Sequence, residues 1–308
     1  MIFSYLKKNG KIEKLVGKSD GNLVRMINPS EEEIEEIVSL LDIEEDYVLD
    51  PLDEDERARV EVDDGKILII IKYPKKLGRE EHVPYRTSSI GIIITPDKTV
   101  IVSKEIVDFL DKSLDAGKID IKKRSKMIFQ LLHMNANVFL WYLKEIQREI
   151  DEIEEELNRS LKNKEIVELM KLEKGLVYFV TSLRSNEILL DRLLKGNVIP
   201  LYEEDRDILE DAIIDTRQAI DTANIFSDIL AGMMDAYASI ISNNLNIVMK
   251  VLAIMTIILE IPTVITSFYG MNVSLPLQKN PLAYLHIVVW SIVSIVLVIY
   301  WFKRKRWL

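Results

Sequence analysis

The spacing of apolar and polar positions changes twice along the chain, and the first part reads as mixed α/β. Short apolar runs are separated by turn signals at Asp64-Gly65 and Pro96-Asp97, and Asn9-Gly10 suits the positive φ angles of a hairpin turn. Ser30 with Glu33 forms a capping box at the start of a helix. The continuous apolar stretches predict a sheet that is covered on at least one face.

From about Lys122 the pattern becomes that of long amphipathic helices, with apolar residues recurring at three and four. One helix is predicted over about 122–158 and a second over about 164–194, where Gly and Pro follow. A third begins near Glu203 and meets no break before Pro262. If it continues to Tyr269 it has roughly 65 residues and is roughly 100 Å long. That length predicts a stalk.

The C-terminal region contains two apolar segments. The second, Ala283 to Phe302, has about 20 residues without a charge, which is enough to cross a bilayer. The basic cluster KRKRWL follows it, and basic clusters stay on the cytoplasmic side. Two spans then place both termini in the cytoplasm, as in a multi-pass protein of the inner cell membrane. The alternative for this segment is a buried core helix.

These patterns predict six consecutive segments. They are a cytoplasmic α/β domain (1–120), acidic cytoplasmic helices (121–200), a stalk helix (201–246), a first transmembrane helix (247–272), an outer loop (273–282), and a second transmembrane helix with a basic tail (283–308).

Charge and composition exclude several classes of function. The net charge is −10, and the region from Ile247 onward carries +5, which leaves −15 for the rest. An acidic body argues against nucleic acid as a partner and fits a domain that meets cations. Cysteine is absent, and His82, His133 and His286 are too scattered for a zinc site. No phosphate-binding motif or catalytic arrangement stands out, so we predict neither an enzyme nor an organic cofactor.

The first span carries a polar stripe. Steps of three and four residues place on one helical face Asn246, Met249, Ala253, Thr256, Glu260, Thr263, Ser267 and Gly270. A polar stripe within a membrane faces protein or water. It is either a dry seam between helices, with Glu260 protonated or paired, or the lining of a pore built by several copies of the chain. Oxygen rings of this kind suit hard divalent cations.

At these residues the sequence resembles the CorA family of divalent-cation channels, within the metal ion transporter superfamily. The motif YGMN closes the first of two C-terminal spans, after a long helix that includes NIVMKVL and before a tail that ends in Arg-Trp-Leu. The resemblance covers the whole chain. It implies a homopentameric funnel in the lipid bilayer that conducts Mg²⁺ passively, with Co²⁺ and Ni²⁺ as further permeant ions.

The resemblance also implies roles for single residues. Gly270, Met271 and Asn272 would form the outer mouth, where a hydrated cation binds. Asn246, Met249 and Thr263 match pore positions of the family, and Met249 with nearby Leu252 would form an apolar constriction. Glu260 departs from the family, which is apolar at this position. It is either an added ion site that changes selectivity or a side chain between helices.

Two acidic residues match the family's regulatory Mg²⁺ sites, which lie between protomers and hold the channel closed. These are Asp50 and Asp211, and the alternative is that both are ordinary surface acids. Two other functions stay open. One is a Zn²⁺ transporter of the same superfamily, coupled to protons through Glu260. The other is a membrane-tethered sensor or scaffold, which would need no polar stripe in its span.

Overall fold

The fold is described from a computed structural model that covers residues 1–8, 11–16, 21–78, 80–117, 119–159, 163–196, 198–273, 275–276 and 280–307. The chain divides into two compact units, Met1–Met234 and Asp235–Leu308. We call the first the head unit and the second the membrane unit.

The head unit is built on a seven-stranded sheet with the strand order β2-β1-β3-β7-β6-β5-β4. Neighbouring strands are antiparallel except β3 and β7, which are parallel. The strands are β1 (Ile2–Lys8), β2 (Lys11–Val16), β3 (Leu23–Ile27), β4 (Arg59–Asp63), β5 (Lys66–Lys76), β6 (Tyr85–Ile94) and β7 (Thr99–Ser103).

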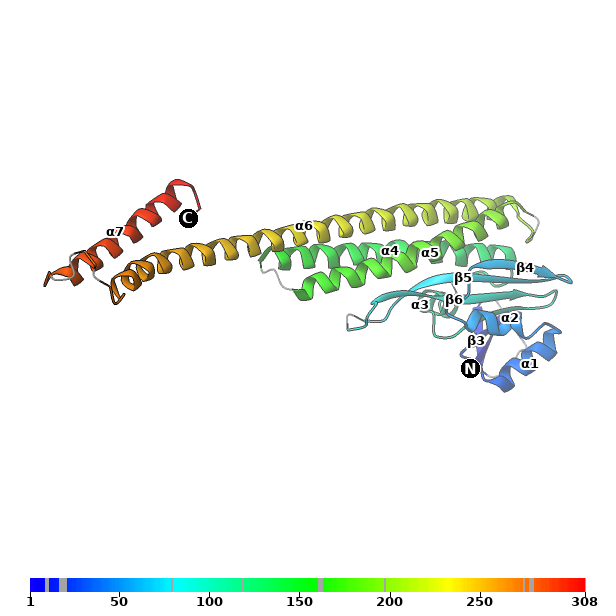
Figure 1. Cartoon of the computed structure of the whole chain (residues 1–308). Helices are drawn as coiled ribbons and strands as arrows, with labels where there is room; N and C mark the ends of the chain where they lie inside the picture. Colours follow the sequence, from blue (N-terminus) through cyan, green and yellow to red (C-terminus); the bar gives the residue numbers. More distant parts are fainter. Residues whose placement is uncertain are drawn as a thin grey trace. The chain divides into compact units, whose positions relative to one another are not determined.

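Both faces of this sheet are buried, and β5 explains how. Its run of apolar residues places Leu68 and Ile70 in one core, with helix α1 (Glu31–Leu41), and Ile69 and Ile71 in the other. Strands buried on both faces read as continuous apolar runs. Also on the first side are the short helices α2 (Asp46–Leu49) and η1 (Asp50–Leu52), and on the second α3 (Asp108–Asp115), α4 (Arg124–Arg159) and α5 (Asn163–Leu194) (Figure 1).

The turns predicted from the sequence are confirmed where the structure describes them. Asp64 and Gly65 both have positive φ, 43° and 74°, as the β4–β5 hairpin requires. The Thr95 amide donates to the Lys98 carbonyl oxygen at 2.9 Å and closes the β6–β7 turn. The Asn9-Gly10 turn lies outside the described residues, although its flanking strands β1 and β2 do pair. The capping box at Ser30 is present.

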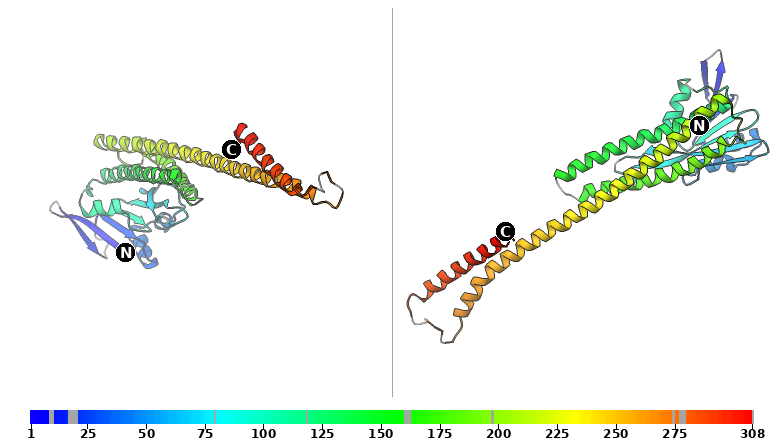
Figure 2. Two further views of the ribbon diagram at one scale, coloured as in Figure 1. Left: turned by 90° about the vertical axis from the view of Figure 1, so that its left-hand side faces the viewer. Right: turned by 90° about the horizontal axis from the view of Figure 1, so that it is seen from above.

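The long helices match their prediction closely, since α4 and α5 begin and end within about two residues of the expected bounds. They pack through Phe139 and Phe179, whose rings are 5.2 Å apart. The first part of helix α6 (Glu203–Tyr269) lies beside them in the head unit (Figure 2). There the Nε2 atom of His133 in α4 lies 3.0 Å from the Oδ2 atom of Asp215 in α6.

Helix α6 runs without a break for 67 residues and continues through Pro262. Proline lacks an amide hydrogen, so the Ile258 carbonyl loses its usual partner there. In the membrane unit α6 is followed by α7 (Ala283–Arg304). Both helices are long and apolar enough to cross a membrane. The predicted α/β head, single long helix and two apolar C-terminal helices are therefore confirmed.

Candidate ion pathway

The membrane part of α6 has two different faces. One face packs against α7, with Ile254 only 1% exposed and Ile258, Ile261 and Ile265 half-buried. A helix turns about 100° per residue, so the polar stripe is centred about 150° away from these isoleucines. Its members are all exposed within the chain: Asn246, Met249, Ala253, Thr256, Glu260, Thr263, Ser267 and Gly270. Helix α7 therefore leaves the stripe uncovered.

The threonines of the stripe have fixed hydroxyl directions. The Thr256 hydroxyl donates to the Leu252 carbonyl oxygen at 2.9 Å, and the Thr263 hydroxyl donates to that of Leu259 at 2.8 Å. A threonine hydroxyl has one hydrogen, and here it is donated to a carbonyl oxygen of the same helix. The remaining lone pairs on the hydroxyl oxygens can accept hydrogen bonds from water or coordinate a cation.

Two other polar side chains of the stripe, and that of Asn272 beyond the end of α6, form no hydrogen bond or ion pair within the described part of the chain. Among the described residues, no hydrogen bond or ion pair involves the side chains of Asn246, Glu260 or Asn272. Leu252 and Met249 are also exposed, at 59% and 56%. If the stripe were a dry seam against α7, Glu260 would need a partner there, and none is present among the described residues. Any partner of the stripe therefore comes from outside the single chain.

The predicted mouth residues directly follow the end of α6. The Gly270 amide still donates to the Thr266 carbonyl oxygen at 3.0 Å, and the Met271 amide to that of Phe268 at 3.4 Å. Gly270 does not adopt the left-handed conformation with which glycine commonly ends a helix. Met271 and Asn272 are exposed beyond the last turn.

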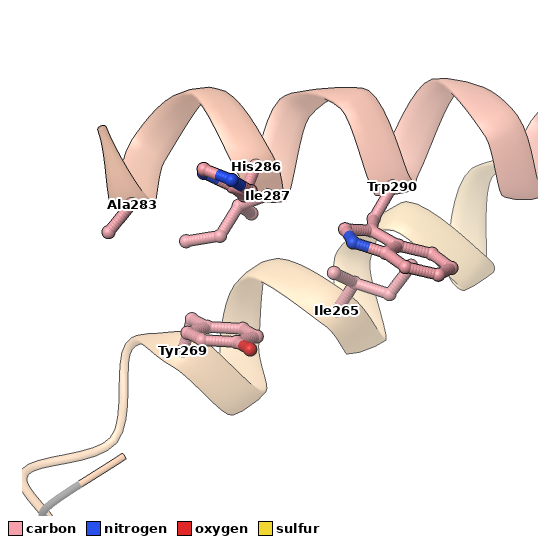
Figure 3. A pocket seen from close by; sticks show the side chains of 6 residues that line it. All are labelled: Ile265, Tyr269, Ala283, His286, Ile287 and Trp290. Atoms are coloured by element: carbon pink, nitrogen blue, oxygen red, sulfur yellow. The ribbon is translucent and has the colours of Figure 1, made fainter. Parts of the chain in front are cut away.

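Close to the predicted mouth residues, the end of α6 and the start of α7 line a half-open pocket of about 250 Å³ (Figure 3). Tyr269 comes from α6, and His286 and Trp290 come from α7. The Nδ1 atom of His286 lies 2.9 Å from the Leu282 carbonyl oxygen, which fixes the ring. The sequence pattern gave no reason to group these aromatic residues, because their proximity depends on how the two helices pack.

At the other end of the membrane unit, Lys250 meets the basic tail. Its Nζ lies 3.5 Å from the Arg306 carbonyl oxygen and 5.7 Å from the ring centre of Trp307. This places the tail beside the first turns of the membrane part of α6 and concentrates positive charge there. A basic cluster next to a membrane span is typical of the cytoplasmic side, which agrees with the predicted orientation.

The two predicted regulatory acids lie in different surroundings. Asp50 opens η1 and accepts a hydrogen bond from Arg59 Nη2 at 2.6 Å, a partner that sequence reasoning missed. Pro51 fixes this position because it packs on Gly91, where an added Cβ would lie 2.2 Å from the proline ring. Asp211 is exposed on α6.

Within one chain the structure does not bring Asp50 and Asp211 together, since no interaction links them among the described residues. In that part of the chain, no group of three or more His, Cys, Asp or Glu side chains is arranged to hold a metal ion.

An α/β head followed by two apolar helices, the first with an uncovered polar stripe, is the arrangement expected of a membrane transport protein. The chain belongs to the CorA-like Mg²⁺ transporter protein family, whose sequence profile matches residues 21–304.

Two relatives and one solved structure support this assignment. The cobalt/magnesium transport protein CorA of Methanocaldococcus jannaschii is 30% identical over 292 residues, which cover 91% of this chain and 89% of the relative. The protein of the same name from Thermotoga maritima is 28% identical over 274 residues, or 84% of this chain and 75% of the relative. The complete structure of the M. jannaschii CorA magnesium transporter matches 100% of this chain and 99% of its own, with a TM-score of 0.86 and 27% identity.

Proposed function

We propose that this protein is a passive channel for divalent cations, with Mg²⁺ as the main permeant ion and Co²⁺ and Ni²⁺ as further ones. The observation that carries the proposal is the uncovered polar stripe of α6, opposite the face that packs on α7. Two relatives are named as cobalt/magnesium transport proteins, which supports this choice of ions.

The pore requires several copies of the chain, because one stripe cannot enclose an axis. We propose a homopentamer in the inner membrane, with the α6 stripes facing the axis and both termini in the cytoplasm. Thr256, Glu260 and Thr263 would then give three rings of oxygen atoms. Successive rings would be separated by about 6 Å and about 4.5 Å along the helix. Met249 and Leu252 would form the apolar constriction.

At the outer mouth, Gly270, Met271 and Asn272 would receive the hydrated ion. Mg²⁺ releases its waters reluctantly, so an amide that accepts hydrogen bonds from those waters binds the ion without stripping it. The side chain of Asn272 is exposed and has no partner among the described residues, which leaves its oxygen available for such water molecules.

Gating would use carboxylates from neighbouring protomers. Asp50 of one protomer and Asp211 of the next would repel each other until a Mg²⁺ ion bridges them, so intracellular Mg²⁺ would stabilise the closed assembly. In this scheme Arg59 competes with the ion for Asp50, because the guanidinium already occupies that carboxylate in the single chain.

A second function is kept open by Glu260, whose carboxylate is exposed in the membrane unit without a partner among the described residues. A carboxylate inside a membrane can carry protons, which would suit a Zn²⁺ transporter coupled to a pH gradient.

The test is Mg²⁺ entry into proteoliposomes with an internal dye, under an inside-negative potential. Asn272→Ala is expected to reduce the entry rate by roughly tenfold or more, because a mouth ligand is lost. Val273→Ala, the next residue along, is the matched control and should leave the rate within about twofold. The assembly state of each variant is measured by light scattering.

Other outcomes decide against the channel. If the assembled wild-type protein passes no Mg²⁺ but moves Zn²⁺ with a pH gradient, the proton-coupled transporter is correct. If it passes no divalent ion at all, the protein is a membrane-tethered sensor or scaffold.

A further inference from the structure

A pocket in the head unit is lined by none of the residues assigned so far to the ion pathway. It has a volume of about 640 Å³ and opens between helix α5, strands β5 and β6, and the loop at residues 54–58. Small-molecule sites typically occupy about 300–1,000 Å³. The pocket is therefore large enough for an organic ligand.

The part of β5 that lines this pocket is held by side-chain hydrogen bonds instead of a neighbouring strand. Strand β4 pairs only with residues 66–70 of β5, so the main chain at Lys72 has no strand on that side. Asn186 accepts a hydrogen bond from the Lys72 amide at 2.9 Å, and both Asn135 and Asn186 donate to the Lys72 carbonyl oxygen at 2.8 Å. These side chains fix the strand where the lysine enters the pocket.

Lys72 is only 5% exposed, and its ammonium group has one N–H without an acceptor among the described residues. Its Nζ donates to the Glu54 carbonyl oxygen at 2.5 Å and to the Ser89 hydroxyl at 3.1 Å, which accounts for two of three N–H groups. Burial lowers the pKa of Lys72, and nearby acids of the loop, Asp55 first, only partly offset this effect. An anion in the pocket would stabilise the charged form.

Arg86 has more unsatisfied hydrogen-bond donors than Lys72 in the part of the chain that the structure describes. Its Nε atom is fully buried and has no hydrogen-bond partner. Among the described residues its side chain interacts only with Tyr178, whose ring centre lies 5.9 Å from the guanidinium carbon. A guanidinium has five donors, and a buried donor without an acceptor is costly. Arg86 therefore presents several unused donors to the pocket.

The other polar groups of the pocket add donors of the same kind. Thr87 and Ser182 are both more than nine-tenths buried and share one hydrogen bond of 2.7 Å, which leaves one hydroxyl hydrogen without an acceptor. Arg57 and Arg184 also line the pocket, and in the described part of the chain the side chain of neither takes part in a hydrogen bond or an ion pair.

The acidic residues of the pocket do not cancel this charge. Glu54 is paired with Lys75 at 3.4 Å and with Lys104 at 3.1 Å, and Glu56 is paired with Arg59. Asp55 is the one lining carboxylate without an ion pair among the described residues. One unpaired carboxylate faces three unpaired arginines and a buried lysine, so the pocket has an excess of positive charge.

We propose that this pocket binds the phosphate groups of a small molecule, with Arg86 as the central ligand. Phosphate offers several charged acceptor oxygens, and arginine matches them with paired N–H groups. The volume is far larger than one phosphate needs, and the exposed ring of Tyr178 supplies a surface on which a planar group can stack. These features favour a nucleotide over free inorganic phosphate.

The experiment is calorimetric titration of the full-length protein in detergent with ATP and, separately, with inorganic phosphate, both in EDTA. ATP is expected to bind, and Arg86→Gln should weaken its binding by roughly tenfold or more, since charged hydrogen bonds are lost. Arg184→Gln should weaken it by roughly threefold or more. Arg148→Gln removes an exposed arginine of α4 that does not line the pocket, and it should leave the affinity unchanged.

Tyr178→Ala separates the two sources of phosphate. It should weaken ATP by roughly threefold or more and leave inorganic phosphate unaffected if the base stacks on the ring. Equal affinities of this variant and the wild type for ATP would assign the site to the phosphate group alone.

Two results would overturn the proposal. One is the absence of binding by either compound at millimolar concentration to the assembled wild-type protein. The other is ATP binding that neither Arg86→Gln nor Arg184→Gln weakens. If the wild-type protein binds no phosphate and Arg86→Gln also reduces the assembled mass, the arginines instead contact a second copy of the chain. Because binding is measured directly, failure here leaves the proposed ion channel untouched.

Discussion

The head unit and the membrane unit treat their polar side chains in opposite ways. In the head unit the fully buried Arg25 donates to Asp111 at 2.8 and 3.2 Å and to the Ser103 hydroxyl at 2.7 Å. Lys76 similarly contacts Glu145 at 2.6 Å and Glu149 at 2.8 Å. In the membrane unit, Glu260 has no such partner among the described residues.

The difference shows which unit finds the partners of its charged groups within a single chain. Burial alone would lower the pKa of Lys76, but Glu145 and Glu149 outweigh it and raise that pKa above its ordinary value. At Arg25 and Lys76, outside the pocket at Arg86, the head unit thus pairs its charges within a single chain. Apart from the isoleucines packed on α7, the membrane unit leaves its apolar side chains and its polar stripe exposed. In the proposed channel, lipid would cover the apolar surface, and ions and other copies of the chain would meet the stripe.

The largest effect we expect comes from breaking the completed network of the head unit. Arg25→Met leaves the carboxylate of Asp111, which is nearly buried, without its guanidinium. Loss of one partner of a buried ion pair costs about 3–5 kcal/mol. Urea unfolding, followed by hydrogen exchange of the amides in β3 and β7, measures this loss.

The double variant Arg25→Met with Asp111→Leu serves as the control. Because it removes both charges, it should recover a large part of the lost free energy of unfolding. A double variant as unstable as the single one would mean that packing around the arginine, rather than its charge, holds the two strands.

A matched pair of leucines in one helix sharpens the comparison further. Leu209 is fully buried in the head unit, and Leu259 is 70% exposed in the membrane unit. Leu209→Ala should cost about 2–5 kcal/mol, whereas Leu259→Ala should cost less than about 1 kcal/mol. The shift of the thermal unfolding midpoint measures both. Equal losses would mean that a neighbouring copy buries Leu259 as deeply as the head unit buries Leu209.

Glu260 tests the functional side of the comparison. If the carboxylate faces the ion, Glu260→Gln should change the ratio of Mg²⁺ to Co²⁺ entry by roughly threefold or more. The matched control is Glu54→Gln, because Glu54 is paired in the head unit, and it should leave the ratio unchanged. An unaltered ratio in Glu260→Gln would place this side chain between helices.

The smallest effect concerns pH and the same control residue. Burial would raise the pKa of Glu54, but Lys104 and Lys75 outweigh it, and the pKa is lowered. A lowered carboxylate pKa gives stability that is present above the unfolded value and is lost as pH falls through the folded value. Glu54→Gln should therefore cost roughly 0.3–0.5 kcal/mol at pH 7.

This difference should disappear in acid, once the pH is below the folded pKa of Glu54. Urea titrations of both proteins at a series of pH values measure it. A cost that stays constant with pH would assign the effect to hydrogen bonding rather than to charge.

Much of the fold follows from local patterns. The periodicity of α4, α5 and α6 gave their bounds closely, and Asp64-Gly65 and Ser30 act through chemistry within a few residues. The polar stripe was equally readable, because residues spaced by three and four on one helix share a face wherever that helix lies.

What the sequence could not give depends on contacts between distant segments. The pairing of Asp50 with Arg59 requires η1 and β4 to meet, and the pocket at Arg86 requires α5 to pack across the sheet. Neither has a periodic signal. The roles of Asp50, Asp211 and Asn272 remain predictions, since they depend on more than one chain.

The packing of α7 on the back of α6 has an electrical consequence. With the stripe on an axis, α7 would lie between that axis and the lipid, adding about 10 Å of low-dielectric material around each conducting helix. Such a layer requires only apolar side chains that fill the space, which agrees with the absence of charged residues from Ala283 to Phe302. Its composition can thus drift freely among apolar residues, provided that the ridge of isoleucines beneath it stays covered.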